Sequence, residues 1–392
     1  MEAFFRTHTY LVEHTNAPVR RMLMDEINWD ERMIGIKGTR GVGKTTFLLQ
    51  YAKEKFGTDR SCLFVNMNNF YFSQYSLVDF AGEFVKRGGK VLLIDQVFKL
   101  PDWSHDLRTC YERYPQLKIV FTGSSVMRLK DENPELNGIV KSYNLRGFSF
   151  REFLNLQTGN HFSAYTLDEI LHNHEHIVKT ILPHINPLNY FQDYIHHGFY
   201  PFFLEKRNFS ENLLKTMNMM IEVDILLIKQ IELKYLSKIK KLLYLLAVDG
   251  PVAPNVSQLA NEIQTSRATV MNYIKYLADA RLINMVYPKG ESFPKKPAKI
   301  MMHNTNLMYS IYPVKVEEQD VLETFFVNTL WKDHKINKGD KGTSFLVDNT
   351  LHFRICAEGS KYKSNPNIYY AMHKMEIGHG DQIPLWLFGF LY

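Results

Sequence analysis

The chain has 392 residues, a hydrophobic fraction of 45% and a formal net charge of +6. Because this length exceeds the size at which one hydrophobic core usually stops growing, we expect several domains. The positive charge is small for such a length and is only a weak indication of nucleic-acid binding.

The composition argues against a membrane protein and against a disulfide-rich one. There is no apolar run of about eighteen residues, as a membrane-spanning helix would need, and residues 1–6 lack the long apolar core of a secretion signal. The cysteines, Cys62, Cys110 and Cys356, are scattered and form no C-x-x-C pair. We therefore expect a soluble cytoplasmic protein, without a membrane partner, whose thiols are reduced and packed.

The chain begins with a predicted amphipathic helix over residues 19–27, which includes Arg20 and Arg21. These arginines could face phosphates, although a solvated helix face is the more ordinary interpretation. Residues 33–36 form a short apolar run, typical of a buried strand that leads into the next motif.

Residues 38–46 read GTRGVGKTT and match the phosphate-binding pattern G-x-x-x-x-G-K-[ST]. Glycines let successive backbone N–H groups point at one anion, and the helix that opens after the loop adds its N-terminal dipole. In this pattern Lys44 would contact the β and γ phosphates, and the Thr45 hydroxyl would bind Mg²⁺. The predicted nucleotide-binding residues are Gly38, Thr39, Arg40, Gly41, Val42, Gly43, Lys44, Thr45 and Thr46.

Two further strands are predicted downstream, at residues 62–66 and 90–95, with a helix over residues 76–85 between them. The second of these strands, KVLLID, ends in Asp95, as the Walker B element of such ATPases does. An aspartate at the carboxyl end of a neighbouring parallel strand would lie beside the Mg²⁺ held by Thr45. We therefore expect Thr45 and Asp95 to form the metal site.

The residue after Asp95 is Gln96, whereas ATP-hydrolysing enzymes of this type usually have glutamate there. A glutamine amide can orient water but cannot accept its proton. Losing general-base catalysis could cost on the order of 10² to 10⁴ in rate. The sequence thus predicts tight nucleotide binding and slow hydrolysis, with Lys44, Asp95 and Gln96 as the catalytic residues.

A fourth strand is predicted over residues 117–125, with small polar residues at its end. Thr122 and either Ser124 or Ser125 could reach the γ-phosphate or the attacking water, as a sensor, but such residues also occur in simple turns. Strands that begin near residues 33, 61, 90 and 117, separated by helical sequence, predict an α/β domain with three layers and a parallel sheet.

The segments GTRGVGKTT, VLLIDQV, LKIVFTGSS and LRGFSFREFLNL together resemble a family of prokaryotic AAA-plus-type P-loop ATPases. The resemblance covers essentially the whole chain and implies ATP as the nucleotide and Mg²⁺ as the cofactor. It implies a P-loop ATPase domain at residues 1–152, a helical region at 153–249, a winged helix at 250–312 and a degenerate nuclease-like α+β domain at 313–392.

Two departures from that family bear on hydrolysis. Asp95-Gln96 stands where family members have an aspartate-glutamate pair. Residues 136–139, LNGI, stand where an arginine pair is common, and Lys141 and Arg146 nearby cannot be assumed to replace it. Both departures favour a slow enzyme.

The helical region begins with a predicted capping box at residues 166–169, followed by an apolar helix face. His172, His174 and His176 suggest a metal site, but their spacing is not the H-E-x-x-H of zinc enzymes. We expect packed or solvated histidines here and assign no metal site. The aromatic turn at residues 198–203 is interpreted as a hydrophobic hinge between helices.

Two short helices, at residues 255–263 and 266–277, predict a helix-turn-helix, and residues 287–299 would form a basic wing. If this module binds duplex DNA, the second helix would read bases and the lysines would contact phosphates. The candidate DNA-binding residues are Arg267, Thr269, Asn272, Lys275, Lys295 and Lys296. The alternative is a protein-docking unit, because the exposed face is also expected to carry Asp279.

In the nuclease-like region, Ser344 and Arg354 occupy strand positions where metal-binding carboxylates would be needed. Glu323, Asp348 and Glu358 do not restore the required spacing. We therefore predict a nuclease fold that has lost its metal centre and its activity. Residues 383–392 are predicted to form a buried final strand.

The leading functional hypothesis is an ATP-binding protein whose slow Mg²⁺-dependent hydrolysis rearranges the helical and C-terminal domains. The second is a nucleotide-dependent DNA-binding regulator or scaffold without significant hydrolysis. Duplex DNA, another protein and a second copy of the chain are the candidate partners besides ATP.

Overall fold

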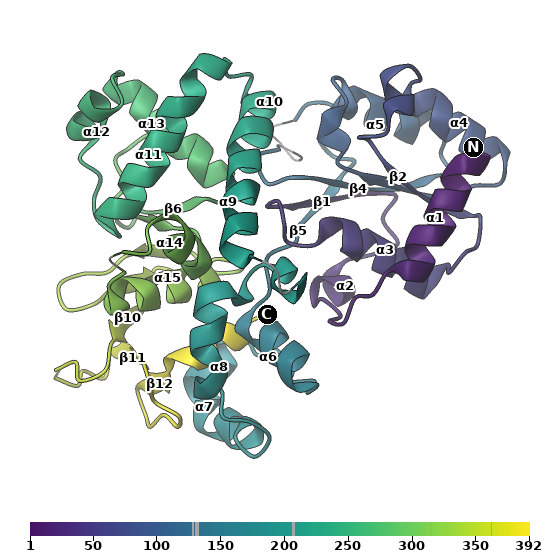
Figure 1. The fold of residues 1–392 in the computed structure, drawn as a ribbon. Helices are drawn as coiled ribbons and strands as arrows, with labels where there is room; N and C mark the ends of the chain where they lie inside the picture. Colours follow the sequence, from purple (N-terminus) through teal and green to yellow (C-terminus); the bar gives the residue numbers. More distant parts are fainter. Residues whose placement is uncertain (128, 130–132, 206–207, 315, 362) are drawn as a thin grey trace. The chain divides into compact units, whose positions relative to one another are not determined.

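The computed structural model describes residues 1–127, 129, 133–205, 208–314, 316–361 and 363–392. The chain divides into two compact units, Met1–Gly147 and Phe148–Tyr392. Figure 1 shows the elements of each unit in sequence colours. Within the described residues, no helix combines the length and apolar character needed to cross a membrane.

The first unit alternates helices and strands. Its elements are α1 (Glu2–His14), α2 (Leu23–Glu26), β1 (Met33–Gly38), α3 (Lys44–Lys55), β2 (Cys62–Asn66), α4 (Leu77–Lys86), β3 (Val91–Asp95), α5 (Trp103–Arg113), β4 (Lys118–Ser124) and β5 (Lys141–Asn144). The strands form one sheet in the order β2-β3-β4-β1-β5, and every neighbouring pair is parallel.

The predicted α/β class with a parallel sheet is confirmed, because the four apolar strands predicted for this unit lie in this sheet. Each residue of β3 is buried, as expected for a parallel strand that is covered on both faces. Figure 1 shows α4 and α5 on one side of the sheet and α3 on the other. The helix predicted over residues 76–85 is also confirmed, and the Ser76 side chain caps it by accepting from the Asp79 N–H.

One local prediction in this unit needs correction, and two elements were not predicted. The helix predicted over residues 19–27 is only the short α2, and Arg21, which precedes it, turns its side chain inward to bind backbone carbonyls. Helix α1 was not predicted, yet it buries Phe5, His8 and Val12 on one face and packs against β2 and α3. Strand β5 was not predicted either, because its sequence, KSYN, is polar and largely exposed.

The second unit begins with helices. They are α6 (Phe150–Thr158), α7 (Leu167–Ile181), α8 (Leu188–Asp193), α9 (Phe209–Met219), α10 (Leu226–Lys229), α11 (Leu236–Asp249), α12 (Val256–Glu262), α13 (Arg267–Asp279), α14 (Thr305–Ile311) and α15 (Glu318–Leu330). The capping box predicted at residues 166–169 is confirmed at the start of α7.

The same unit contains two sheets. Strands β6 (Ile283–Val286) and β7 (Lys299–Met302) form an antiparallel pair. The other sheet has the order β12-β11-β10-β9-β8, in which β10, β11 and β12 run parallel and the other pairs are antiparallel. Its strands are β8 (Ile336–Lys338), β9 (Phe345–Val347), β10 (Leu351–Cys356), β11 (Ile368–Met372) and β12 (Gln382–Pro384).

One apolar core joins distant parts of the second unit. Helices α6, α7 and α8 contribute to it together with α15, the larger sheet and the end of the chain. Residues 382–392 are buried, with the exception of the half-buried Gln382, but only Gln382–Pro384 is a strand; Leu385–Phe390 forms a 3-10 helix. The prediction of a final strand is therefore wrong for most of this segment, because the chain turns to pack Trp386 and Phe390 into this core.

The aromatic turn at residues 198–203 follows a π-helical turn, Tyr194–Gly198. A π-turn leaves carbonyl groups without their usual helical partners. The buried side chain of Asn306 donates to the carbonyls of Tyr194 and Ile195, at 3.1 and 2.7 Å, and accepts from the Phe199 N–H. This segment is thus fixed by hydrogen bonds from the start of α14.

The thiols of Cys62, Cys110 and Cys356 are all free and buried. Burial raises the pKa of both Cys62 and Cys110 to about 12. These thiols are therefore packing groups, as the sequence predicts.

Candidate functional site

The loop between β1 and α3 requires glycine for two different reasons. Gly43 has a φ of 91°, in the left-handed region that favours glycine. A Cβ at Gly38 would lie 2.4 Å from the carbonyl oxygen of Leu145, so only glycine allows this close approach. Leu145 in turn donates its N–H to the Lys37 carbonyl over 2.7 Å, which continues the pairing of β1 with β5.

The other predicted nucleotide-binding residues follow the same turn. Val42 is fully buried and Thr39 nearly so, which makes them supports of the loop, while Arg40 and Gly41 are half-buried and Thr46 is exposed on α3. Lys44 begins α3, and its Nζ donates to the carbonyls of Gly38 and Thr39 over 2.8 and 2.7 Å. The ammonium group is thus held at the centre of the loop.

The buried carboxylate of Asp95, at the end of β3, is hydrogen-bonded to three neighbouring side chains. The Thr45 hydroxyl lies 2.8 Å from Oδ2, and the Asn66 Nδ2 lies 2.8 Å from the same oxygen. The Thr122 hydroxyl lies 2.6 Å from Oδ1. Asn66 and Asp95 end β2 and β3, Thr122 lies near the end of β4, and Thr45 follows β1 through the loop. The carboxyl ends of these neighbouring strands meet at one edge of the parallel sheet.

Asn66 is the member of this cluster that the sequence reasoning missed. It is the last residue of β2 and is paired in register with Asp95 of β3. A polar residue at the end of the strand before Asp95 was therefore the available signal. Its amide has a donor for the carboxylate, and its Oδ1 accepts from the Asn68 N–H over 2.8 Å.

Gln96 has an unusual backbone conformation, with φ 58° and ψ 46°. Left-handed geometry at a residue other than glycine is strained, and such strain is concentrated at functional sites. The Gln96 N–H donates to the Thr122 hydroxyl over 2.9 Å, so Thr122 joins Gln96 to Asp95. The other predicted sensor residue, Ser124, is buried and accepts a long hydrogen bond from the Val126 N–H.

Arg21 is a second residue whose place could not be read from the sequence. Its buried guanidinium donates to the Val42 carbonyl of the loop over 3.2 Å, and to the carbonyls of Arg146 and Gly147 over 2.7 and 3.0 Å. Its neighbour Arg20 is an exposed residue that pairs with Asp25 and Glu54. One side chain therefore links the loop to the last residues of the first unit.

The donor set fits a magnesium-bound triphosphate. Mg²⁺ prefers hard oxygen ligands and usually takes one or two protein groups, with phosphates and water completing its shell. The Thr45 hydroxyl and the Asp95 carboxylate supply such oxygens side by side. The Lys44 ammonium and the N-terminus of α3 supply positive charge and N–H donors for the phosphates.

The predicted DNA-binding residues lie on α13 and on the segment between β6 and β7. Arg267, Asn272, Lys295 and Lys296 are exposed, whereas Thr269 is half-buried and its N–H is capped by Ser266. Lys275 is 2.7 Å from Asp279, and Lys295 is 3.2 Å from Glu291.

Asp279 was expected on the exposed face, and it is in fact half-buried. Its carboxylate, only 20% exposed, accepts from both Lys275 and Lys229. The contact with Lys229, at the end of α10, ties α13 to the preceding helices.

The carboxylates considered for a nuclease centre have separate partners. Glu323 pairs with Lys299, Glu358 pairs with Lys374, and Asp348 accepts from the Lys335 N–H. Among the residues that the structure describes, no group of three or more potential metal-ligating His, Cys, Asp or Glu side chains converges.

Comparisons with known proteins bear on the first unit and on part of the second. Residues 30–154 match the family model described as an AAA domain. This match includes the loop, Asp95 and Thr122, and it indicates a P-loop nucleotide-binding domain of the AAA ATPase type, which implies ATP and Mg²⁺. Residues 188–317 match a model described as a domain of unknown function, DUF8612.

An uncharacterized protein from Methanocaldococcus jannaschii is 28% identical over 288 residues, which are 69% of this chain. The match spans 60% of that relative's own length. The solved structure of C. elegans PCH-2 aligns with 40% of this chain and 44% of that chain, at 17% identity and a TM-score of 0.25. A likeness of this size supports no inference about this chain.

Proposed function

We propose that the first unit binds Mg²⁺-ATP and hydrolyses it slowly. The observation that carries this proposal is the 2.8 Å contact between the hydroxyl of Thr45 and the carboxylate of Asp95. These residues come from two motifs that are far apart in the sequence, and the parallel sheet brings them to one edge. Their proximity is what a site for a magnesium-bound phosphate requires.

Each residue has a distinct role in this proposal. Lys44 exchanges its bonds to the loop carbonyls for bonds to the β and γ phosphates, and Thr45 and Asp95 supply oxygen ligands for Mg²⁺. Asn66 and Thr122 hold the Asp95 carboxylate in place. Gln96 orients the attacking water without removing its proton, so hydrolysis is slow.

Arg21 supports a route from the nucleotide to the rest of the chain. It joins the Val42 carbonyl of the loop to the carbonyls of Arg146 and Gly147, immediately before the second unit. A loop that shifts when phosphates bind would change these bonds. We therefore propose that nucleotide occupancy acts on the junction and rearranges the helical and C-terminal regions.

Titration with a fluorescent ATP analogue in the presence of Mg²⁺ tests binding, and phosphate release tests hydrolysis. Lys44→Ala should abolish binding, while Lys55→Ala, which removes an exposed lysine from the same helix, should leave it unchanged. Binding without phosphate release above background would refute the hypothesis of an ATPase and retain that of an ATP-binding protein. Unaltered binding by Lys44→Ala would refute the assigned site.

A second candidate function is nucleotide-dependent binding of duplex DNA. Its support is the order of α12, a short turn, α13 and an antiparallel strand pair, which is that of a winged helix. Arg267 and Asn272 are exposed near the start of α13, where a recognition helix would read bases. In this alternative the nucleotide regulates DNA binding and is not significantly hydrolysed. The competing use of this surface is docking of another protein or of a second copy of the chain.

A further inference from the structure

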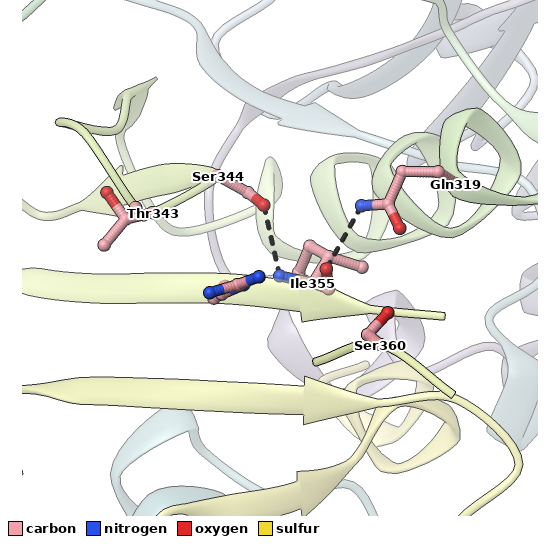
Figure 2. Close-up of a pocket in the computed structure, with 7 residues that line it drawn as sticks. Gln319, Thr343, Ser344, Ile355 and Ser360 are labelled. Atoms are coloured by element: carbon pink, nitrogen blue, oxygen red, sulfur yellow. Dashed lines mark hydrogen bonds between the residues drawn. The ribbon is translucent and has the colours of Figure 1, made fainter. Parts of the chain in front are cut away.

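A polar pocket of about 320 Å³ lies beside the larger sheet of the second unit. Its polar side chains come from the start of α15, the loop before β9, strand β10 and the turn after that strand: Gln319, Thr343, Ser344, Arg354 and Ser360. Figure 2 shows Thr343 and Ser344 on one side of the pocket and Gln319 and Ser360 toward the other. This volume is at the lower end of the range for small-molecule sites, roughly 300 Å³ upward.

The orientation of the Gln319 amide follows from its partners. Its Nε2 lies 3.3 Å from Oε1 of Glu323 and 3.1 Å from the carbonyl of Ile355. An ionised carboxylate and a carbonyl only accept hydrogen bonds, so the NH₂ group must face them. Both of its hydrogens are used, and the side-chain oxygen of Gln319 is available as an acceptor.

The hydrogen-bonding capacity that each hydroxyl group of the pocket leaves for a ligand also follows from its present partners. Ser344 accepts from the Ile355 N–H over 3.1 Å, as Figure 2 shows, and keeps its own hydrogen for donation. Thr343 donates its hydrogen to the Asp340 carbonyl over 3.0 Å and keeps acceptor capacity. Ser360 makes no side-chain hydrogen bond with any described residue, so it can donate or accept.

The charge in the pocket wall is positive. Arg354 donates from Nη2 to the Lys361 carbonyl over 3.1 Å, which ties the guanidinium to the turn after β10. No carboxylate is among the described lining residues. Of the acidic side chains close to the pocket in sequence, Glu323 pairs with Lys299 and Glu358 with Lys374. Glu318 and Asp320 flank Gln319 on α15, and Glu318 lies 3.3 Å from His373.

We propose that this pocket binds a small phosphorylated polyol, such as a sugar phosphate. The phosphate group pairs with Arg354 and accepts from the hydroxyl of Ser344, because a guanidinium with a hydroxyl donor suits an oxyanion, and Ser360 on the other side binds the remaining part of the ligand. The free hydroxyls of the ligand donate to the oxygens of Gln319 and Thr343. The site is independent of the proposed ATP site, which lies in the other unit.

Isothermal titration calorimetry of the full-length Lys44→Ala protein tests this site without phosphate binding at the glycine loop. The probes are glucose 6-phosphate, inorganic phosphate and glucose. We expect glucose 6-phosphate to bind, inorganic phosphate to bind at least about tenfold more weakly, and glucose to give no heat, because the phosphate supplies the charge and the hydroxyls supply the remaining bonds.

In the Lys44→Ala protein, a further Arg354→Gln substitution should weaken glucose 6-phosphate binding at least about tenfold. Ser360→Ala in the same protein should weaken it several-fold. Ser360→Ala removes a hydroxyl without a partner among the described residues, so it tests the site even if Arg354→Gln disturbs the turn. Lys335→Gln, which neutralises an exposed lysine outside the pocket, is the matched control and should bind as the parent does.

Absence of heat with glucose 6-phosphate would overturn the proposal. So would equal binding by Arg354→Gln, Ser360→Ala and Lys335→Gln, because the ligand would then be elsewhere. Inorganic phosphate that binds as tightly as glucose 6-phosphate would refute recognition of the polyol. A single-stranded oligonucleotide that binds more tightly and requires Arg354 would identify a nucleic-acid site instead.

Discussion

Thr122 and Asp95 are joined by a 2.6 Å hydrogen bond from the threonine hydroxyl to the carboxylate. A hydroxyl has one hydrogen, so Thr122 in this arrangement has none to donate to a γ-phosphate. It also accepts from the Gln96 N–H. The geometry therefore favours Thr122 as a residue that positions Asp95 and Gln96.

Thr122→Val should destabilise the protein by about 1–3 kcal/mol, because buried polar groups lose their partner. It should also raise the Mg²⁺ concentration needed for half-maximal ATP binding, since Asp95 loses one of the hydrogen bonds that hold it. Urea denaturation and Mg²⁺ titration measure the two effects. Thr122→Ser, which keeps the hydroxyl, should restore the Mg²⁺ requirement; if Thr122→Val leaves that requirement unchanged, the positioning role is refuted.

Gln96→Glu should increase the rate of ATP hydrolysis by about tenfold or more, because a carboxylate can accept the proton of the attacking water. Gln96→Met, which can neither orient water nor accept its proton, should lower the rate. Single-turnover phosphate release with saturating ATP separates this effect from binding. If Gln96→Glu gives no increase, the defect lies elsewhere, for example in the missing arginine pair.

Arg21→Met should destabilise the first unit by about 1–3 kcal/mol, because three carbonyls lose a buried charged donor. Arg20→Met is the matched control, and loss of its exposed ion pairs should cost less than about 1 kcal/mol. Limited proteolysis near residue 147 then tests coupling. ATP should change the cleavage rate in the parent and in Arg20→Met but not in Arg21→Met; the same ATP effect in all three proteins would contradict the proposed route.

His8 makes the stability of the first unit depend on pH. Its Nδ1 accepts from the Phe64 N–H over 3.0 Å, and burial lowers its pKa. Because the unfolded chain then binds a proton more readily, stability should fall as the pH drops from about 6.5 toward the lower folded pKa.

Urea denaturation between pH 7.5 and 5.5 measures this dependence. The fluorescence of Trp29 and Trp103 reports the unfolding. His8→Asn keeps an acceptor near Phe64 and removes the titration, so it should flatten the part of the pH dependence that His8 causes. Parallel pH profiles for the parent and His8→Asn would show that His8 is not responsible.

If the second unit binds duplex DNA, replacing Lys295 and Lys296 with glutamine should weaken binding. The plot of log affinity against log salt concentration should become shallower by about two, because each lost phosphate contact removes about 0.9 from its slope. The pair Lys53→Gln and Lys55→Gln, on α3 of the other unit, is the matched control. Unchanged affinity and slope in the Lys295 and Lys296 variant would favour a protein-docking role.

The sequence predicted the apolar part of the first unit well, because buried parallel strands are continuous runs of aliphatic residues such as VLLI before Asp95. It did not reveal β5, whose polar side chains contain no burial signal, and which is defined by its backbone pairing with β1. The end of the chain is apolar as predicted, but apolar composition alone does not separate a strand from a tight helix.

In the candidate site, the motif residues Lys44, Thr45 and Asp95 could be predicted because their chemistry is tied to local spacing. Arg21 and Asn66 could not be identified in this way, since their partners are set by the tertiary fold. The left-handed backbone of Gln96 is likewise a property of the folded chain, and the sequence shows only that an amide stands there.

The bond between His8 and Phe64 has a consequence for association between molecules. Strand β2 is at the margin of its sheet, and α1 covers it there. An uncovered strand of this kind offers its backbone to strands of other molecules and promotes aggregation. Helix α1 therefore shields the outer backbone edge of β2 from pairing with strands of other molecules.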